Sequence, residues 1–261
     1  MYTMKKIIFI LVFMMLFSES VFSQLKPVSY YDGTQKLNGL LAPSSKKNKN
    51  APGVLILPAW KGIDTSSKNV ANELASLGYT VFIADIYGEG NYPKDNSEAG
   101  KIAGFYKTNY SEYQKRIQLA LTELVKNGAK EGNIVVIGYC FGGTGALETV
   151  RGKLNVKGVV SFHGGLRKDA ARTSPTSITA KVLVCNGADD KSVTNEDIQN
   201  FEKEMRDGKA DWEFISYGNA VHSFTNPEAG NDASTGNAYN EKAAKRSFAR
   251  LLLFLKETLE N

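Results

Sequence analysis

The stretch that decides the fold is residues 133–143, Asn-Ile-Val-Val-Ile-Gly-Tyr-Cys-Phe-Gly-Gly. Its first five residues form an apolar, β-branched run, which predicts a buried strand. A helix is predicted after the glycine-containing turn that follows this strand. A strand, a sharp Gly-rich turn and a helix form the setting of a nucleophile elbow, with Cys140 where most such enzymes carry serine. Gly138 and Gly142 provide the small residues that this turn needs, because strand and helix backbones crowd there. The turn predicts a cysteine hydrolase if partner residues exist elsewhere in the chain.

Length and composition indicate one α/β domain. The chain has 261 residues, of which 42% are hydrophobic and 23% charged. This length and hydrophobic content are sufficient for one α/β domain with its own core. We predict a single domain over residues 24–261, since no internal repeat and no Pro/Gly/Ser linker divides that part of the sequence.

Residues 1–23 have the pattern of a secretory signal peptide. Lys5 and Lys6 form a basic segment, an apolar run of 11 residues follows at 7–17, and Val21-Phe22-Ser23 is an imperfect cleavage site. The apolar run is short for a bilayer span, so an uncleaved anchor is the weaker alternative. We therefore expect a periplasmic or secreted protein without a stable membrane anchor.

The charge of the chain is only mildly basic. The net charge is +5, and loss of residues 1–23 removes two lysines and one glutamate, which leaves +4. The basic cluster at residues 46–49 has no aromatic residues interleaved with it, so we expect no nucleic-acid partner. The two cysteines and two histidines are scattered, without the short paired spacings of zinc sites, so neither a metal nor another cofactor is predicted.

Strands and helices alternate along the chain, after an opening antiparallel hairpin at residues 28–41 that turns at Asp32-Gly33. This alternation predicts a mostly parallel sheet covered by helices on both faces. The predicted strands are 53–58, 80–84, 133–139, 156–162, 181–186 and 212–217, and the predicted helices are 66–77, 110–127, 142–151, 195–206 and 240–259. Ligands of such sheets bind beyond the carboxyl ends of the strands, so functional residues should directly follow strands.

Cys140, Asp190 and His222 each follow a predicted strand, in the chain order nucleophile, acid, histidine. A thiol reacts as its thiolate, a histidine can accept the thiol proton and later protonate the leaving group, and a carboxylate orients the histidine. Asp189 is the alternative acid; Asp190 is favoured because it stands three residues after Gly187 and three before Val193.

An oxyanion hole needs two backbone N–H groups. We predict Phe141, directly after the nucleophile, and Trp60, in the loop after the first parallel strand. The Trp60, Tyr87 and Phe224 rings are predicted to wall the substrate pocket, although each could be an ordinary packing aromatic. His163 is interpreted as a structural residue near the pocket.

These residues together resemble the dienelactone hydrolase family, the cysteine-nucleophile branch of the α/β-hydrolases. The matching segments are 138–143, Asp85-Ile86-Tyr87-Gly88, Gly187-Ala188-Asp189-Asp190, His222-Ser223-Phe224 and the tail with Ala238-Tyr239-Asn240 and Arg246-Ser247. The resemblance covers the chain from about Gly53 onward. It implies the α/β-hydrolase fold, with Cys140 as nucleophile, His222 as base and Asp190 as the residue that orients it.

Three positions depart from the family pattern. Ala59 stands where the bacterial enzymes carry a glutamate that takes part in activating the thiol, and Glu89 and Asn226 stand where the family holds the substrate carboxylate with arginines. Without these charged groups the electrostatic reason to bind a dienelactone carboxylate is absent. The sequence therefore supports the hydrolytic machinery better than the family's namesake substrate.

The function that we predict is hydrolysis of a small carboxylic ester or lactone through a Cys-His-Asp triad. A thioesterase or an amide-cleaving enzyme is the alternative within hydrolases. A non-catalytic binding scaffold and a Cys140–Cys185 disulfide are alternatives of other classes. Residues 226–237, which follow the histidine, form either a lid or a connector, and the oligomeric state is left open.

Overall fold

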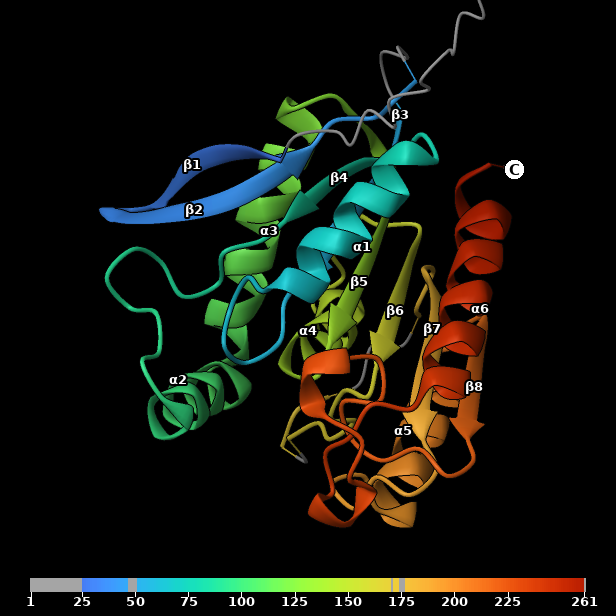
Figure 1. Cartoon of the computed structure of the whole chain (residues 1–261). Helices are drawn as coiled ribbons and strands as arrows, with labels where there is room; N and C mark the ends of the chain where they lie inside the picture. The colour runs from blue at the N-terminus through green and yellow to red at the C-terminus, as the bar shows by residue number, and fades with distance from the viewer. Residues whose placement is uncertain (1–24, 47–50, 170, 174–176, 261) are drawn as a thin grey trace, which may run out of the picture.

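A computed structural model describes residues 25–46, 51–169, 171–173 and 177–260 of the chain. The predicted signal peptide lies outside the described residues. The described chain contains one sheet, drawn in Figure 1. Its strands are β1 Lys26–Asp32, β2 Gln35–Ala42, β3 Ala51–Leu57, β4 Thr80–Ile83, β5 Ala129–Tyr139, β6 Gly158–Phe162, β7 Lys181–Gly187 and β8 Trp212–Tyr217.

The sheet is mostly parallel. β1 and β2 form the predicted antiparallel hairpin, and β2 pairs antiparallel with β4. From β4 onward all neighbouring strands are parallel, in the order β1-β2-β4-β3-β5-β6-β7-β8 across the sheet. This arrangement confirms the predicted α/β-hydrolase fold class. It also brings the carboxyl ends of β5, β6, β7 and β8 to one edge.

Helices cover both faces of the sheet, and each face has its own apolar core. The helices are α1 Thr65–Ser76, α2 Asn96–Thr108, α3 Tyr110–Lys126, α4 Phe141–Arg151, α5 Asn195–Asp207 and α6 Glu241–Leu259. On one face α1 and α6 bury side chains such as Leu74 and Leu251. On the other, α3 and α4 bury Ile117 and Leu147. Figure 1 views the sheet from the α1 and α6 side, with α3 and α4 behind it. Burying each such side chain contributes about 2 kcal/mol.

The sequence pattern does not predict α2. Its helix contains Gly100 and Gly104, and each glycine costs about 1 kcal/mol of helix propensity relative to alanine. The helix forms because Asp95 caps it, accepting the Glu98 N–H at 2.8 Å, and because Ala99, Ala103 and Tyr106 are buried. Within the described ranges, no helix combines the length and the apolarity needed to cross a bilayer.

Candidate active site

The turn at Cys140 joins β5 to α4. Cys140 has φ 53° and ψ −112°, and such a positive φ costs a non-glycine residue about 1–3 kcal/mol. A Cβ at Gly138 would collide with the carbonyl group of Gly142, and a Cβ at Gly142 would collide with the carbonyl group of Leu57. Both glycines are thus needed because the strand and helix backbones approach closely at this turn, as the sequence pattern predicts.

Three side chains that follow different strands meet at this turn. Cys140 Sγ lies 3.0 Å from His222 Nε2, and His222 Nδ1 lies 2.8 Å from Asp190 Oδ2. Cys140 follows β5, Asp190 follows β7 and His222 follows β8. The structure therefore brings together the three residues predicted as nucleophile, acid and histidine, although Cys140 and His222 are 82 positions apart.

The structure distinguishes the two adjacent aspartates. Asp190 is 4% exposed, and its Oδ1 accepts hydrogen bonds from the Ser192 N–H at 2.9 Å and hydroxyl at 2.6 Å. These bonds leave Oδ2 aimed at His222. Asp189 is exposed, and α5 is capped by Thr194 rather than by either aspartate. Asp190 is therefore the carboxylate that contacts the histidine, as favoured from its spacing.

The surroundings of Cys140 and His222 favour charge separation between them. Burial disfavours the Cys140 thiolate, but the hydrogen bond with His222 and the nearby charges of His222 and Lys107 outweigh burial and hold the pKa of the thiol below its ordinary value. Burial also opposes the charging of His222, but its hydrogen bonds with Asp190 and Cys140 raise its pKa to about 10. The pair is therefore set up to hold a thiolate beside an imidazolium.

The second histidine lies beside the first and has the opposite character. His163 follows β6, is 3% exposed, and its Nε2 lies 2.8 Å from the Thr225 hydroxyl. Burial and the charge of His222 lower the pKa of His163 to about 3. It is neutral at ordinary pH, which agrees with its interpretation as a structural residue near the site.

The two predicted oxyanion donors lie on different turns, and Trp60 lines the same cavity as Cys140. Phe141 is the first residue of α4, and its backbone N–H forms a hydrogen bond with the Cys140 thiol. Trp60 lies in the turn after β3, where the Gly62 N–H bonds the Ala59 carbonyl group at 2.9 Å. The Tyr87 hydroxyl donates to the Trp60 carbonyl oxygen at 2.8 Å and so fixes this turn.

Two of the three aromatic rings predicted to wall the pocket are instead buried behind it. Tyr87 is 3% exposed and stacks on Phe141, with ring centroids 5.7 Å apart. Phe224 is fully buried and packs edge-on against His163. Neither ring is among the residues that line the cavities containing Cys140, because such rings next to strand ends gain more free energy in the core than at a cavity wall. Trp60 does line the cavity.

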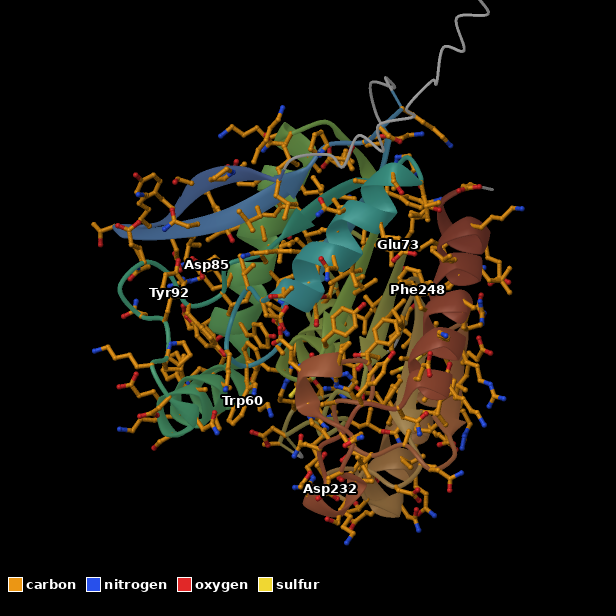
Figure 2. All side chains as sticks on the ribbon, viewed as in Figure 1. Trp60, Glu73, Asp85, Tyr92, Asp232 and Phe248 are labelled. Carbon is orange, nitrogen blue, oxygen red and sulfur yellow. The ribbon has the colours of Figure 1, made fainter. Side chains whose placement is uncertain are left out.

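Two cavities meet at Cys140. An open cleft of about 1150 Å³ contains Cys140, His222 and Asp190 and is bounded by residues 233–237. A second cavity of about 480 Å³ lies between α1 and α6, in the region where Figure 2 labels Glu73 and Phe248. Of the segment 226–237, residues 233–237 therefore form part of the wall of the cleft, and Asn226 lines the second cavity. The sequence pattern does not predict the second cavity, because facing helices are not visible in a linear sequence.

The described residues match a known family over most of the chain. The model of the "Dienelactone hydrolase family" matches residues 37–259. The chain belongs to the dienelactone hydrolase family. This membership confirms both the resemblance drawn from the sequence and the prediction of a hydrolase.

Solved and curated proteins are similar to this chain over most of their own length. A structure described as a "Dienelactone Hydrolase-like Promiscuous" phosphotriesterase from metagenomic libraries is 33% identical, with a TM-score of 0.84, covering 90% of this chain and 98% of that one. A "Probable 2-oxo-3-(5-oxofuran-2-ylidene)propanoate lactonase" from Bradyrhizobium sp is 28% identical over 215 residues, 78% of this chain and 83% of the relative. An uncharacterised protein of Caenorhabditis elegans is 37% identical over 121 residues, 46% of this chain and 77% of the relative.

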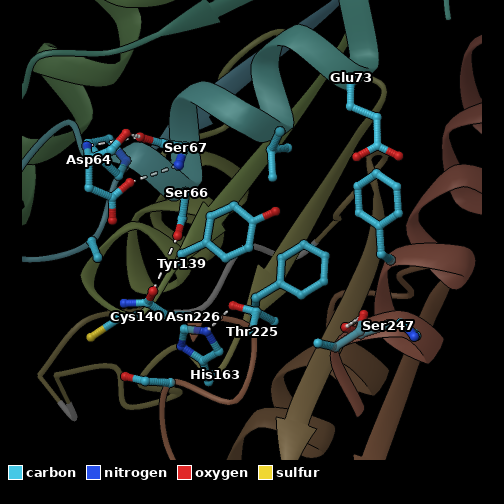
Figure 3. A pocket seen from close by; sticks show the side chains of 18 of the residues that line it. Asp64, Ser66, Ser67, Glu73, Tyr139, Cys140, His163, Thr225, Asn226 and Ser247 are labelled. Carbon is cyan, nitrogen blue, oxygen red and sulfur yellow. Dashed lines mark hydrogen bonds between the residues drawn. The ribbon is translucent and has the colours of Figure 1, made fainter. Parts of the chain in front are cut away.

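The structure also locates the three departures from the dienelactone hydrolase pattern. Ala59 lines the α1/α6 cavity next to Trp60 and brings no ionisable group there. Glu89 is paired with Lys36 at 2.9 Å on the β1/β2 hairpin. Asn226 accepts a hydrogen bond from the Ser66 hydroxyl at 3.2 Å, drawn in Figure 3. None of these three residues brings a positive charge to the cavities around Cys140.

Both cysteines of the chain are free thiols in the structure. Cys185 is fully buried in β7 and contacts the Tyr217 hydroxyl at 3.7 Å. Burial raises the pKa of this thiol to about 12. Cys185 is thus an unreactive core residue, which gives no support to the disulfide alternative.

Proposed function

We propose that this protein hydrolyses carboxylic esters or lactones by nucleophilic catalysis at Cys140. The observation that carries the proposal is the continuous hydrogen-bonded line from Cys140 Sγ through His222 to Asp190. Nucleophile, base and orienting acid are each in contact with the next, which is the geometry that covalent acyl transfer requires. No metal or other cofactor is needed for this chemistry.

Acylation starts from the thiolate. His222 Nε2 holds the thiol proton, and Sγ attacks the carbonyl carbon, so that a C–S bond forms and the carbonyl oxygen becomes an oxyanion. The N–H groups of Phe141 and Trp60 stabilise that oxyanion. When the intermediate collapses, the C–O bond to the alcohol breaks, and the leaving oxygen takes the proton from His222.

Deacylation repeats these steps with water. His222, now neutral, takes a proton from a water molecule in the cleft while the oxygen attacks the thioester carbonyl carbon. The C–S bond breaks, the carboxylic acid leaves, and the thiolate forms again beside the imidazolium. Asp190 stabilises the imidazolium in both halves of the cycle and fixes which ring nitrogen faces Cys140.

The same groups could cleave thioesters or amides, and the related promiscuous phosphotriesterase suggests phosphotriesters as a further electrophile. The non-catalytic scaffold gains its support from Ala59, which leaves Cys140 without the family's glutamate. The lowered pKa of the Cys140 thiol argues for an activated nucleophile despite that loss.

Turnover of p-nitrophenyl acetate by wild type, Cys140→Ala and Cys185→Ala tests the proposal. We expect Cys140→Ala to lose activity by a factor on the order of 10³ or more, while Cys185→Ala keeps it. Equal rates for wild type and Cys140→Ala would refute the assignment. To rank the carbonyl classes, turnover is compared at equal concentration for phenyl acetate, S-phenyl thioacetate and acetanilide. A phosphotriester such as paraoxon tests the phosphorus electrophile.

We also propose that the mature protein is exported as a single domain after removal of residues 1–23. Support for export comes from the order of basic, apolar and small residues at the N-terminus. Expression of the full chain in a bacterium, followed by N-terminal sequencing of the periplasmic fraction, is expected to give a chain beginning at Gln24. An unprocessed chain in the cytoplasmic fraction would contradict export.

A further inference from the structure

The cavity between α1 and α6 is a groove with Cys140 at one end. One wall is a face of α1, one wall is a face of α6, and the floor is formed by Tyr139 and Phe162 at the ends of β5 and β6. Figure 3 shows Cys140 at one end of this groove, the carboxylate of Glu73 at the other, and the ring of Tyr139 between them. The hydrolytic steps above use only the Cys140 end.

We propose that this α1/α6 groove holds the acyl chain of the substrate, and that the preferred substrates are esters of apolar, medium-chain carboxylic acids. This inference rests on the proposed ester hydrolysis at Cys140, and it adds which acids are accepted and where they lie. A volume of about 480 Å³ is within the range of sites that bind small molecules.

The assignment of the acyl part to the groove follows from the position of His222. His222 lines the open cleft together with Cys140, and it is not among the residues that line the groove. Because His222 gives its proton to the leaving oxygen, the alcohol must depart on the cleft side. The acyl part is bonded to the same carbonyl carbon and points away from the leaving group, toward the side of Trp60 and the groove.

The groove is built for an apolar chain. Val70 of α1, Phe248 and Leu252 of α6, and the aromatic floor are half-buried or buried apolar side chains. Small side chains keep the groove open: Ala59 at the Cys140 end, and Ser66, Ser67, Ala244 and Ser247 along the helices. Burying an acyl chain there gains about 0.8 kcal/mol per CH₂ group.

The length of the groove limits the length of the chain. From Ser66 to Glu73 the α1 wall rises by seven residue steps, which is about 10 Å along a helix axis. An extended chain of about eight carbons, with bonds of about 1.5 Å in a zigzag, covers the same distance. The exposed carboxylate of Glu73 lies at the far end, and the Lys245 ammonium group that also lines the groove is paired with Glu241 at 2.6 Å. The charge of Glu73 therefore disfavours an acid that ends in a second carboxylate.

The test compares p-nitrophenyl acetate with p-nitrophenyl octanoate in wild type, Val70→Phe and Asn69→Phe. Val70 lines the groove. Asn69 is its exposed neighbour on α1 and points about 100° away around the helix, so it is the matched control. We expect Val70→Phe to lose at least tenfold in kcat/KM for the octanoate and to stay within twofold of wild type for the acetate. Asn69→Phe should match wild type on both esters.

A second pair of variants keeps the test valid if Val70→Phe unfolds. Ala249→Phe fills the groove from the exposed side of α6 and should have the same selective effect, whereas Leu253→Phe, on an exposed position of α6 outside the groove, should have none. An unchanged octanoate-to-acetate ratio in a folded groove variant would overturn the inference and leave the proposed hydrolysis intact. The proposed function is tested separately by acetate turnover in Cys140→Ala. Loss of this turnover supports hydrolysis at Cys140, and unchanged turnover refutes it.

Discussion

The ring of His163 stands edge-on to the ring of His222, with centroids 5.2 Å apart and an interplanar angle of 68°, yet the pKa values of the two histidines are moved in opposite directions. Burial and the charge of His222 lower the pKa of His163 to about 3, whereas the hydrogen bonds to Asp190 and Cys140 raise that of His222 to about 10. Neighbouring titratable groups with divergent pKa values mark a division of roles. His222 carries the proton, and His163 is a buried, neutral residue that packs against it.

The neutral state of His163 makes folding depend on pH. Below pH 6.5 the unfolded chain protonates this histidine and the folded chain does not, so stability present at neutral pH is lost as pH falls toward 3. The slope reaches about 1.4 kcal/mol per pH unit. Urea unfolding at pH 6.5 and 5 should show wild type losing about 1.5 kcal/mol more than His163→Gln. The same loss in both proteins would contradict a buried, neutral His163.

The Cys140 thiol should ionise at a lower pH than an ordinary thiol does. The midpoint of iodoacetamide alkylation against pH is expected below the ordinary thiol pKa of about 8.5. In His222→Ala the midpoint should rise, because the hydrogen bond and charge that oppose burial are gone. A midpoint near 8.5 that His222→Ala leaves unchanged would favour the binding scaffold over the enzyme.

The two aspartates after β7 should differ sharply in their effect on rate. Asp190→Asn removes the carboxylate that fixes the His222 ring, and we expect kcat to fall by a factor on the order of 10³ to 10⁴. Asp189→Asn changes an exposed neighbour and should stay within twofold of wild type. Steady-state kinetics on p-nitrophenyl acetate measure both. A similar loss in the two variants would show that the effect is not specific to the contact with His222.

The elbow should not tolerate a methyl group. In Gly142→Ala the new Cβ meets the carbonyl group of Leu57, and because a packed backbone cannot retreat, we expect loss of folding or at least 2 kcal/mol of stability. Gly104→Ala in α2 meets nothing within 4 Å and should stabilise the protein by about 0.5–1 kcal/mol. Thermal unfolding of both variants checks this. Two variants of equal stability would mean that the turn has room that the structure does not give it.

The sequence predicts best what depends on residues close together in the chain. The strand at residues 133–137, the glycines around Cys140 and the apolar stripe of α6 are local patterns, and the parallel sheet then determines that residues after its strands meet. That is why Cys140, Asp190 and His222 could be named from the sequence, and why Asp190 could be preferred over Asp189 from spacing alone.

What the sequence does not predict depends on packing between distant segments. Tyr87 and Phe224 follow strands as pocket residues do, but whether a ring turns to the core or to the cavity is decided by neighbours such as Phe141 and His163. The α1/α6 groove exists because small residues on two helices face each other, and that pairing is visible only after folding. The helix at α2 depends on a cap and on buried alanines that outweigh its glycines.

Mass spectrometry of the acid-quenched enzyme during turnover of p-nitrophenyl octanoate reveals whether the substrate acyl group is carried on the sulfur of Cys140. We expect one octanoyl group per chain, on the peptide that contains Cys140, absent from Cys140→Ala and lost over time as the ester is consumed. Steady turnover without acyl label on that peptide, or equal turnover by Cys140→Ala, would contradict acyl transfer to Cys140.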